Sequence, residues 1–147
     1  MATEASWLSR VETLYREYIQ KAEELEKNRK IGDGLFGLTP GPADDPCHER
    51  FAQELEELLK ACAESSPGSE TAAEILRFQF AAPQAHEEVK SLYWMLIAVQ
   101  GLGGALMGCL SPVEAASLAA EYGALYPRRL RLPVQKQLLK SLERKAR

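Results

Sequence analysis

A chain of 147 residues has the usual size of one domain, and it can bury roughly 70% of its unfolded surface without disulfides or metals. Its 46% hydrophobic and 27% charged residues exclude the composition of a disordered chain and that of a membrane protein. The net charge of −3 conceals an asymmetry, because residues 1–127 hold 10 basic and 20 acidic residues whereas residues 128–147 hold 8 basic and one acidic. Such a split indicates either an interaction tail or a tail that lies on its own acidic body.

The first long segment, residues 4–30, is predicted to be an amphipathic helix. Its apolar residues recur at alternating spacings of three and four, which places them on one face: Leu8, Val11, Tyr15, Tyr18, Ala22 and Leu25. Residues 32–46 then concentrate glycines and prolines, which predicts a long loop. A second helix is expected to open with Asp45 as its N-cap and Pro46 in its first position. Its buried face is expected to hold Phe51, Leu55, Leu58, Leu59 and Cys62.

The second half of the chain is also expected to be helical. Pro83 indicates either two helices or one helix bent at that residue. Residues 91–110 carry no charge and are apolar on every side. A capping box that begins at Ser111 predicts a helix over 112–125, and a last, basic helix is expected over 133–147.

These elements predict an all-α fold class, a compact bundle of five to six helices with a central apolar helix, in a single domain over 1–147. No window shows the β-branched alternation of a strand. The segment 91–110 is also long enough to span a bilayer, and its four glycines include the GxxxG pair Gly104 and Gly108. Gln100 at its centre favours the bundle interior instead, where the amide needs a hydrogen-bond partner and the glycines let neighbouring backbones approach. We therefore expect no transmembrane segment.

Cys47 and His48 form the most specific chemical candidate. They lie in the predicted first turn of the second helix, where exposed amides and the helix dipole lower the pKa of a thiol. This placement raises two hypotheses, a reactive thiolate and, together with Asp44, Asp45 and His86, a metal site. The alternative is a structural or merely exposed pair, because the spacing of these residues is unspecific.

The cysteines of the chain predict its redox environment. Cys47, Cys62 and Cys109 are odd in number and lack a repeating spacing, so neither a disulfide framework nor a zinc motif is indicated. The first residues show no basic start followed by an apolar run, so we expect no signal peptide. Reduced thiols and a cytoplasmic location follow as expectations.

Basic residues near the C-terminus are the candidates for binding an acidic partner: Arg128, Arg129, Arg131, Lys136, Lys140 and Arg144. A basic amphipathic helix can bind anionic membranes, RNA or an acidic protein. The alternative is a surface helix whose apolar stripe closes the bundle and whose charges meet the acidic body. Because residues 128–147 contain no aromatic side chain for base stacking, nucleic acid is the less favoured partner.

The sequence contains no GxxxxGK[ST], GxSxG or HExxH motif, so we expect no cofactor and do not favour an enzyme. The leading hypothesis is a non-enzymatic module that binds a protein partner or forms a homo-oligomer, motivated by the regular apolar face of the first helix and the basic tail. Two alternatives stay open. One is a thiol- or metal-dependent enzyme or sensor that uses Cys47 and His48, and the other is nucleic-acid binding through the basic C-terminal segment.

Overall fold

The computed structural model describes residues 6–27, 45–127, 129 and 131–147. Most of the predicted long loop therefore lies outside the described residues. Within those ranges six α-helices and two 3₁₀-helices follow one another without a strand, which confirms the all-α fold class. The elements are α1 (Trp7–Lys27), α2 (Cys47–Glu64), α3 (Ser69–Ala81), η3 (Ala82–His86), α4 (Lys90–Ala98), η4 (Val99–Cys109), α5 (Pro112–Leu125) and α6 (Pro133–Ala146).

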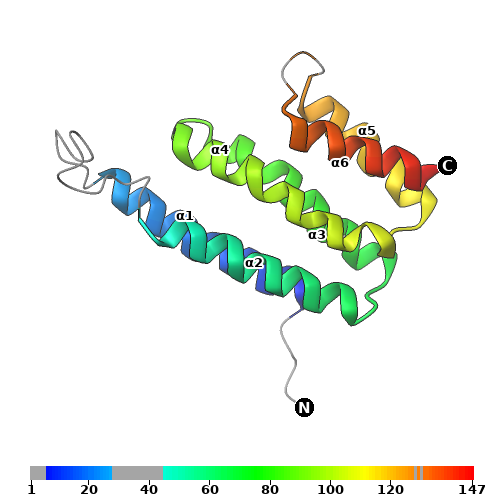
Figure 1. Cartoon of the computed structure of the whole chain (residues 1–147), viewed down its shortest axis with the longest axis horizontal. Coiled ribbons are helices and arrows are strands. Elements are labelled where there is room, and N and C mark those ends of the chain that lie inside the picture. Colours follow the sequence, from blue (N-terminus) through cyan, green and yellow to red (C-terminus); the bar gives the residue numbers. More distant parts are fainter. Residues whose placement is uncertain (1–5, 28–44, 128, 130) are drawn as a thin grey trace.

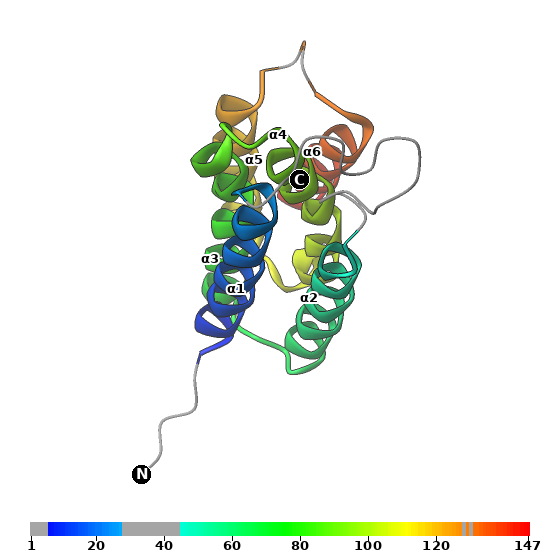
Figure 2. The same ribbon diagram turned by 90° about the vertical axis from the view of Figure 1, so that its left-hand side faces the viewer.

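The helices form three antiparallel hairpins that stack side by side in two layers (Figure 1). Helices α1, α3 and α5 make one layer (Figure 2). The other layer, called the α2/α6 layer below, consists of α2, the segment α4–η4 (Lys90–Cys109) and α6. Helix η4 contacts α2 on one side, α6 on the other and α3 beneath. The predicted apolar helix is therefore central within its layer.

Local signals place several helix ends. The hydroxyl of Ser111 accepts a hydrogen bond from the Glu114 N–H at 3.2 Å, and α5 covers the predicted range 112–125. The carboxylate of Asp45 accepts the N–H of Cys47 at 2.9 Å, but Pro46 holds the N-cap position of α2, so the predicted N-cap at Asp45 is wrong by one residue. The helix itself begins at Cys47, one residue later than predicted.

Pro83 divides the third helical region into two elements. Helix α3 ends at Ala81, and the short turn η3 carries the proline before α4 begins at Lys90. Proline has no N–H to continue the α-helical hydrogen bonds, so the chain leaves the α-helix just before it. Because η3 follows α3 without a gap, the region is one helical stretch whose winding changes at Ala82, and no separate α-helix begins at Pro83.

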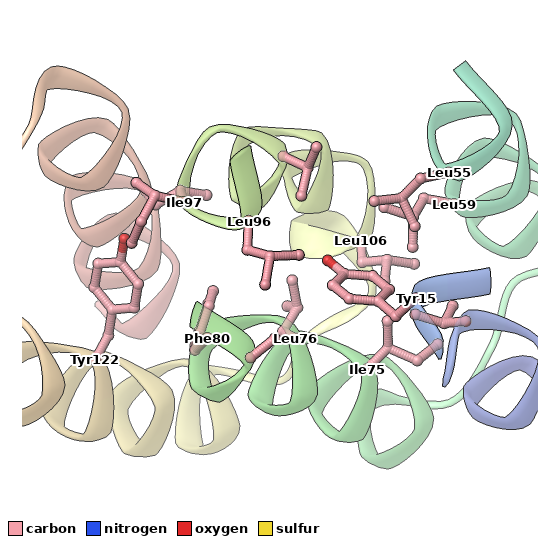
Figure 3. Close-up of a cluster of buried hydrophobic side chains, with 14 of the residues drawn as sticks. Tyr15, Leu55, Leu59, Ile75, Leu76, Phe80, Leu96, Ile97, Leu106 and Tyr122 are labelled. Carbon is pink, nitrogen blue, oxygen red and sulfur yellow. The ribbon is translucent and has the colours of Figure 1, made fainter. Parts of the chain in front are cut away.

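One hydrophobic cluster fills the space between the layers, and Figure 3 shows part of it, with Tyr15 of α1 near Leu76 and Leu106. The predicted stripe of α1 is buried in this cluster at Val11, Tyr15, Tyr18 and Ala22. In α2 the predicted face is buried except for Leu58, which is half-buried. Leu8 and Leu25 are only partly buried, so it is the middle of the apolar face of α1 that is covered by its own chain.

The α4–η4 helix changes its winding where its glycines begin. It is α-helical up to Ala98 and continues as a 3₁₀-helix of eleven residues over Val99–Cys109. Long 3₁₀ runs are uncommon because side chains three residues apart eclipse one another. Ala98, Gly101 and Gly104 stand three residues apart and have little or no side chain to eclipse. The second half of the predicted helix 91–110 is therefore wound more tightly than expected.

Candidate functional site

Cys47 and His48 lie at the start of α2, against α1. The Nδ1 atom of His48 forms a hydrogen bond of 2.7 Å with the hydroxyl of Tyr18, and the two rings meet edge to face. Tyr18 also stacks on Phe51, with 4.1 Å between the ring centroids. These contacts fasten the first turn of α2 to α1, which is a structural role for His48.

The thiol of Cys47 is not activated in the way that its position at a helix start predicted. Burial raises its pKa, and the adjacent carboxylate of Asp45 raises it further, to about 11. The cations Lys21 and Arg50 lower the pKa by less. Desolvation and a neighbouring anion both disfavour the thiolate, and here they outweigh the helix dipole. The expected lowering of the Cys47 pKa is therefore wrong, and the thiolate hypothesis loses its physical basis.

The two histidines contact different residues of α1. Nδ1 of His86 lies 3.8 Å from a carboxylate oxygen of Glu23, whereas His48 is bonded to Tyr18. Within the described ranges no group of three or more His, Cys, Asp or Glu side chains could hold a metal ion. Asp44 lies outside those ranges. The described residues thus give the metal hypothesis no ligand set.

A buried network of glutamines and tyrosines lies between the layers. Gln100 donates through Nε2 to the carbonyl oxygen of Gln79 and to the hydroxyl of Tyr126, at 3.2 Å each. Its Oε1 accepts the hydroxyl of Tyr122 at 2.9 Å. The Gln79 side chain in turn donates to the hydroxyl of Tyr15 at 3.0 Å. The sequence analysis predicted only that Gln100 needs an internal partner, which is confirmed.

This network holds helices together and has no group poised for proton transfer near neutral pH. Gln79 and Gln100 are completely buried. Burial raises the pKa of Tyr126 to about 12 and raises the pKa values of Tyr15 and Tyr122 as well. The hydroxyls therefore stay protonated and keep their hydrogen bonds, which join α1, α3, η4 and α5.

Most of the basic candidates near the C-terminus lie on or beside α6. Arg131, Lys136 and Lys140 line a common hollow beside α6, whereas Arg144 is exposed outside it. Among the described residues no ion pair joins α6 to the acidic part of the chain.

In its described part the segment before α6 contains no α-helix. Helix α6 begins at Pro133, so Arg129 and Arg131 precede it. Nε of Arg131 donates to the carbonyl oxygen of Tyr126 at 2.9 Å, which ties this residue to the end of α5. Arg128 lies outside the described residues.

The outer face of the α4–η4 helix is open. The segment Ser91–Cys109 is long and apolar enough to cross a membrane, yet only 39% of it is buried in the fold. Trp94 is 52% exposed. We call the exposed residues of this segment the open face: Ser91, Trp94, Ala98, Gly101, Gly104, Ala105 and Gly108. A helix apolar on every side was expected to be enclosed on every side, and that expectation is wrong. Helices α2 and α6 flank this helix and α3 covers it from beneath, while its outer face stays exposed.

The glycines of this helix have two different surroundings. A Cβ atom at Gly103 would lie 2.7 Å from a leucine methyl of α3, and one at Gly101 would lie 3.0 Å from a valine methyl of α6. A Cβ atom at Gly104 or Gly108 would meet nothing within 4 Å. The expectation that these glycines let neighbouring helices approach is confirmed at Gly101 and Gly103 and wrong at the other two.

The fold and this surface together define an all-α protein built from two helical layers, one of which has an uncharged centre. Comparison of the chain with known protein families, with curated proteins and with solved structures finds no match. Function is therefore inferred from the surface chemistry of the chain itself.

Proposed function

We propose that this chain is a non-enzymatic, cytoplasmic helical module that binds another protein or a second copy of itself through the α2/α6 layer. The observation that carries the proposal is the open face, an uncharged helix surface that includes the half-exposed Trp94. Contiguous exposed apolar surface with a polar rim is typical of interaction sites. Charged helices α2 and α6 supply such a rim on both sides.

The layered architecture supports the same proposal. Stacked helical hairpins present a continuous layer of helices to their partners in α-solenoid proteins. Tryptophan is enriched among the residues that dominate binding energy at interface centres. Small residues beside it let the backbone of a partner approach closely. Trp94 with the glycines of the open face combines these two properties on one helix.

The thiol-dependent alternative makes an opposite prediction about Cys47. A reactive thiol would be alkylated faster at neutral pH than an ordinary cysteine, whose pKa is about 8.5. A pKa raised to about 11 predicts slower alkylation instead. The rate, measured in a variant that keeps Cys47 and replaces Cys109 by serine, separates the two proposals.

Light scattering on the purified chain, combined with capture of partners from a lysate, tests the module proposal. We expect either a mass above that of the monomer or retention of a defined protein. Gly104→Arg should weaken either association by about tenfold or more, because it places an unpaired charge at the centre of the interface. Ala120→Arg, an exposed site on α5 in the other layer, is the matched control and should leave binding unchanged. Binding that survives Gly104→Arg, or no association at all, would contradict the proposal.

A further inference from the structure

The charges of the α2/α6 layer are sorted by helix. Helix α2 carries five acidic and two basic residues, and α6 carries four basic and one acidic. Between them the α4–η4 helix has no charge from Ser91 to Cys109. In the other layer adjacent helices exchange charges, as Arg77 of α3 does with Glu121 of α5 at 2.9 Å. An uncharged helix separates α2 from α6, and no ion pair joins these two helices in the part of the chain that the structure describes.

The acidic flank of α2 borders the open face. Glu54 and Leu58 line a groove with α1, which fixes the flank of α2 that faces α1. Glu56 lies two residues beyond Glu54, about 200° around the helix, and is therefore turned away from α1. Helix α2 contacts α1 and η4, so Glu56, and with it Glu49 one heptad earlier, belongs to the η4 side. Both carboxylates are on exposed residues, and that of Glu56 also pairs with Lys60 of the same helix at 2.9 Å.

The basic flank of α6 borders the open face from the other side. Val134 packs on Gly101, which fixes the flank of α6 that faces η4. Lys145 lies eleven residues further on, about three helical turns, and so shares the flank of Val134. The neighbouring Arg144 is exposed at the outer edge of that flank. The layer therefore runs from acidic through uncharged to basic.

Two copies that meet face to face through this layer have two possible two-fold axes. An axis parallel to the helices places α2 of each copy over α6 of the other, with the two open faces running parallel. An axis across the helices places α2 over α2 and α6 over α6, which brings like charges together. Helices α2, α4–η4 and α6 all run in the same direction, so the C-terminal halves of α2 and α6 meet only about the first axis (Figure 1). Charge complementarity selects the parallel arrangement.

The geometry points to a parallel homodimer in which two open faces pack together and α2 of each copy pairs with α6 of the other. This inference rests on the proposed function and names its partner as a second copy. A membrane surface is the poorer fit to the same face. Alanine and glycine gain little from hydrocarbon, and the carboxylates of α2 would oppose anionic headgroups, whereas small residues favour close contact between helices.

Disulfide trapping in the full chain tests the arrangement. Cys47 and Cys109 are replaced by serine, the buried Cys62 is kept, and one new cysteine is introduced by Ala98→Cys or by Gly108→Cys. These positions are ten residues apart, about 20 Å along a 3₁₀-helix. A disulfide needs Cα atoms within about 7 Å, so only a parallel pair can join both positions to their own counterparts. We expect covalent dimers from both variants and none from Ala120→Cys.

Charge reversal gives an independent test of the same pairing. Variant A carries Lys140→Glu and Arg144→Glu on α6, and variant B carries Glu57→Lys and Glu64→Lys on the exposed C-terminal half of α2. Each variant alone should dimerise about tenfold more weakly than the wild type. In the homodimer of either variant, α2 of one copy and α6 of the other carry like charges, and the two-fold axis creates this contact twice. An equimolar mixture of A and B should recover the wild-type affinity as a heterodimer. Added salt should weaken the wild-type dimer, because the pairs lie at an exposed rim.

The outcomes separate this inference from the proposed function. A dimer that is trapped at one position or at neither, or that grows stronger with salt, overturns the parallel arrangement and leaves self-association intact. A monomer that captures a different protein, with loss of capture in Gly104→Arg, overturns the homodimer and leaves the interaction module intact. A monomer that sediments with anionic phospholipid vesicles through the open face overturns both.

Discussion

The inner and outer faces of the α4–η4 helix are made of similar residues and have different surroundings. On the inner face Gln100 is completely buried with partners for its amide, and Gly103 touches side chains of α3. On the outer face Trp94 is half-exposed, and a Cβ atom added at Gly104 would meet nothing within 4 Å. The lesson is that an apolar sequence predicts burial for a helix but not for each of its faces. In a two-layer stack the middle helix is covered on three sides and open on the fourth.

Replacing Gln100 by methionine should produce the largest loss of stability. Methionine has a similar volume but removes the hydrogen bonds to Tyr122, Tyr126 and the carbonyl of Gln79, and leaves those buried groups without this partner. We expect the free energy of unfolding to fall by about 2–4 kcal/mol in urea denaturation. Gln53→Met, at an exposed site on α2, should change it by less than about 0.5 kcal/mol. Equal effects of the two variants would show that the inner face does not depend on its polar network.

Adjacent glycines allow the sharpest comparison of the two faces. Gly103→Ala should lower the free energy of unfolding by about 1–3 kcal/mol, because the added methyl meets packed side chains of α3. Gly104→Ala should raise it by about 0.4–1 kcal/mol, because the methyl meets open space and restricts the unfolded chain. Urea denaturation of dilute protein measures both. A change of the same sign in both variants would contradict the assignment of inner and outer faces.

Alkaline pH should loosen the inner face. The pKa of Tyr126 is raised from 10.0 to about 12 by burial, so the fold favours the neutral hydroxyl. The stabilisation that this hydroxyl provides is present in full below pH 10 and is lost as the pH rises toward about 12. Unfolding midpoints measured across this range, with tyrosinate absorbance recorded in parallel, should fall together with ionisation.

Tyr126→Phe provides the control for this pH dependence. The slope of stability against pH should become shallower without vanishing, because the pKa values of Tyr15 and Tyr122 are raised as well. Gly104→Ala, on the outer face, should leave the slope unchanged. Tyrosines that ionise in a chain that stays folded would show that the network is not sealed from solvent.

The sequence was sufficient where local chemistry decides. The cap at Ser111 and the proline at 133 act on their own first turns, and α5 and α6 begin where those residues predict. The pairing of Gln79 with Tyr15 could not be predicted in this way, because 64 residues separate the partners. Nor could the open face be predicted, since Gly103 and Gly104 are identical neighbours that differ only in direction.

Cys47 shows how a correct local rule gives a wrong result for a site. The helix start was predicted to within one residue, and a helix dipole does favour a thiolate there. The dominant cause of its raised pKa is burial at its place beside α1, and that contact joins segments far apart in the sequence. Fold class and helix ends therefore follow from local patterns, whereas the chemistry of the candidate site depends on tertiary packing.

The smallest effect on the folded monomer is expected from Ala105→Lys on the open face. An exposed alanine contributes little to the fold, so the free energy of unfolding of dilute protein should change by less than about 0.5 kcal/mol. If two copies pair through this face, the wild-type Tm rises with protein concentration by mass action, and Ala105→Lys should abolish that rise. Ala120→Lys, exposed in the other layer, should retain it. A lower Tm of Ala105→Lys at the highest dilution would mean that the open face supports the monomer itself, and the contrast between the two faces would fail.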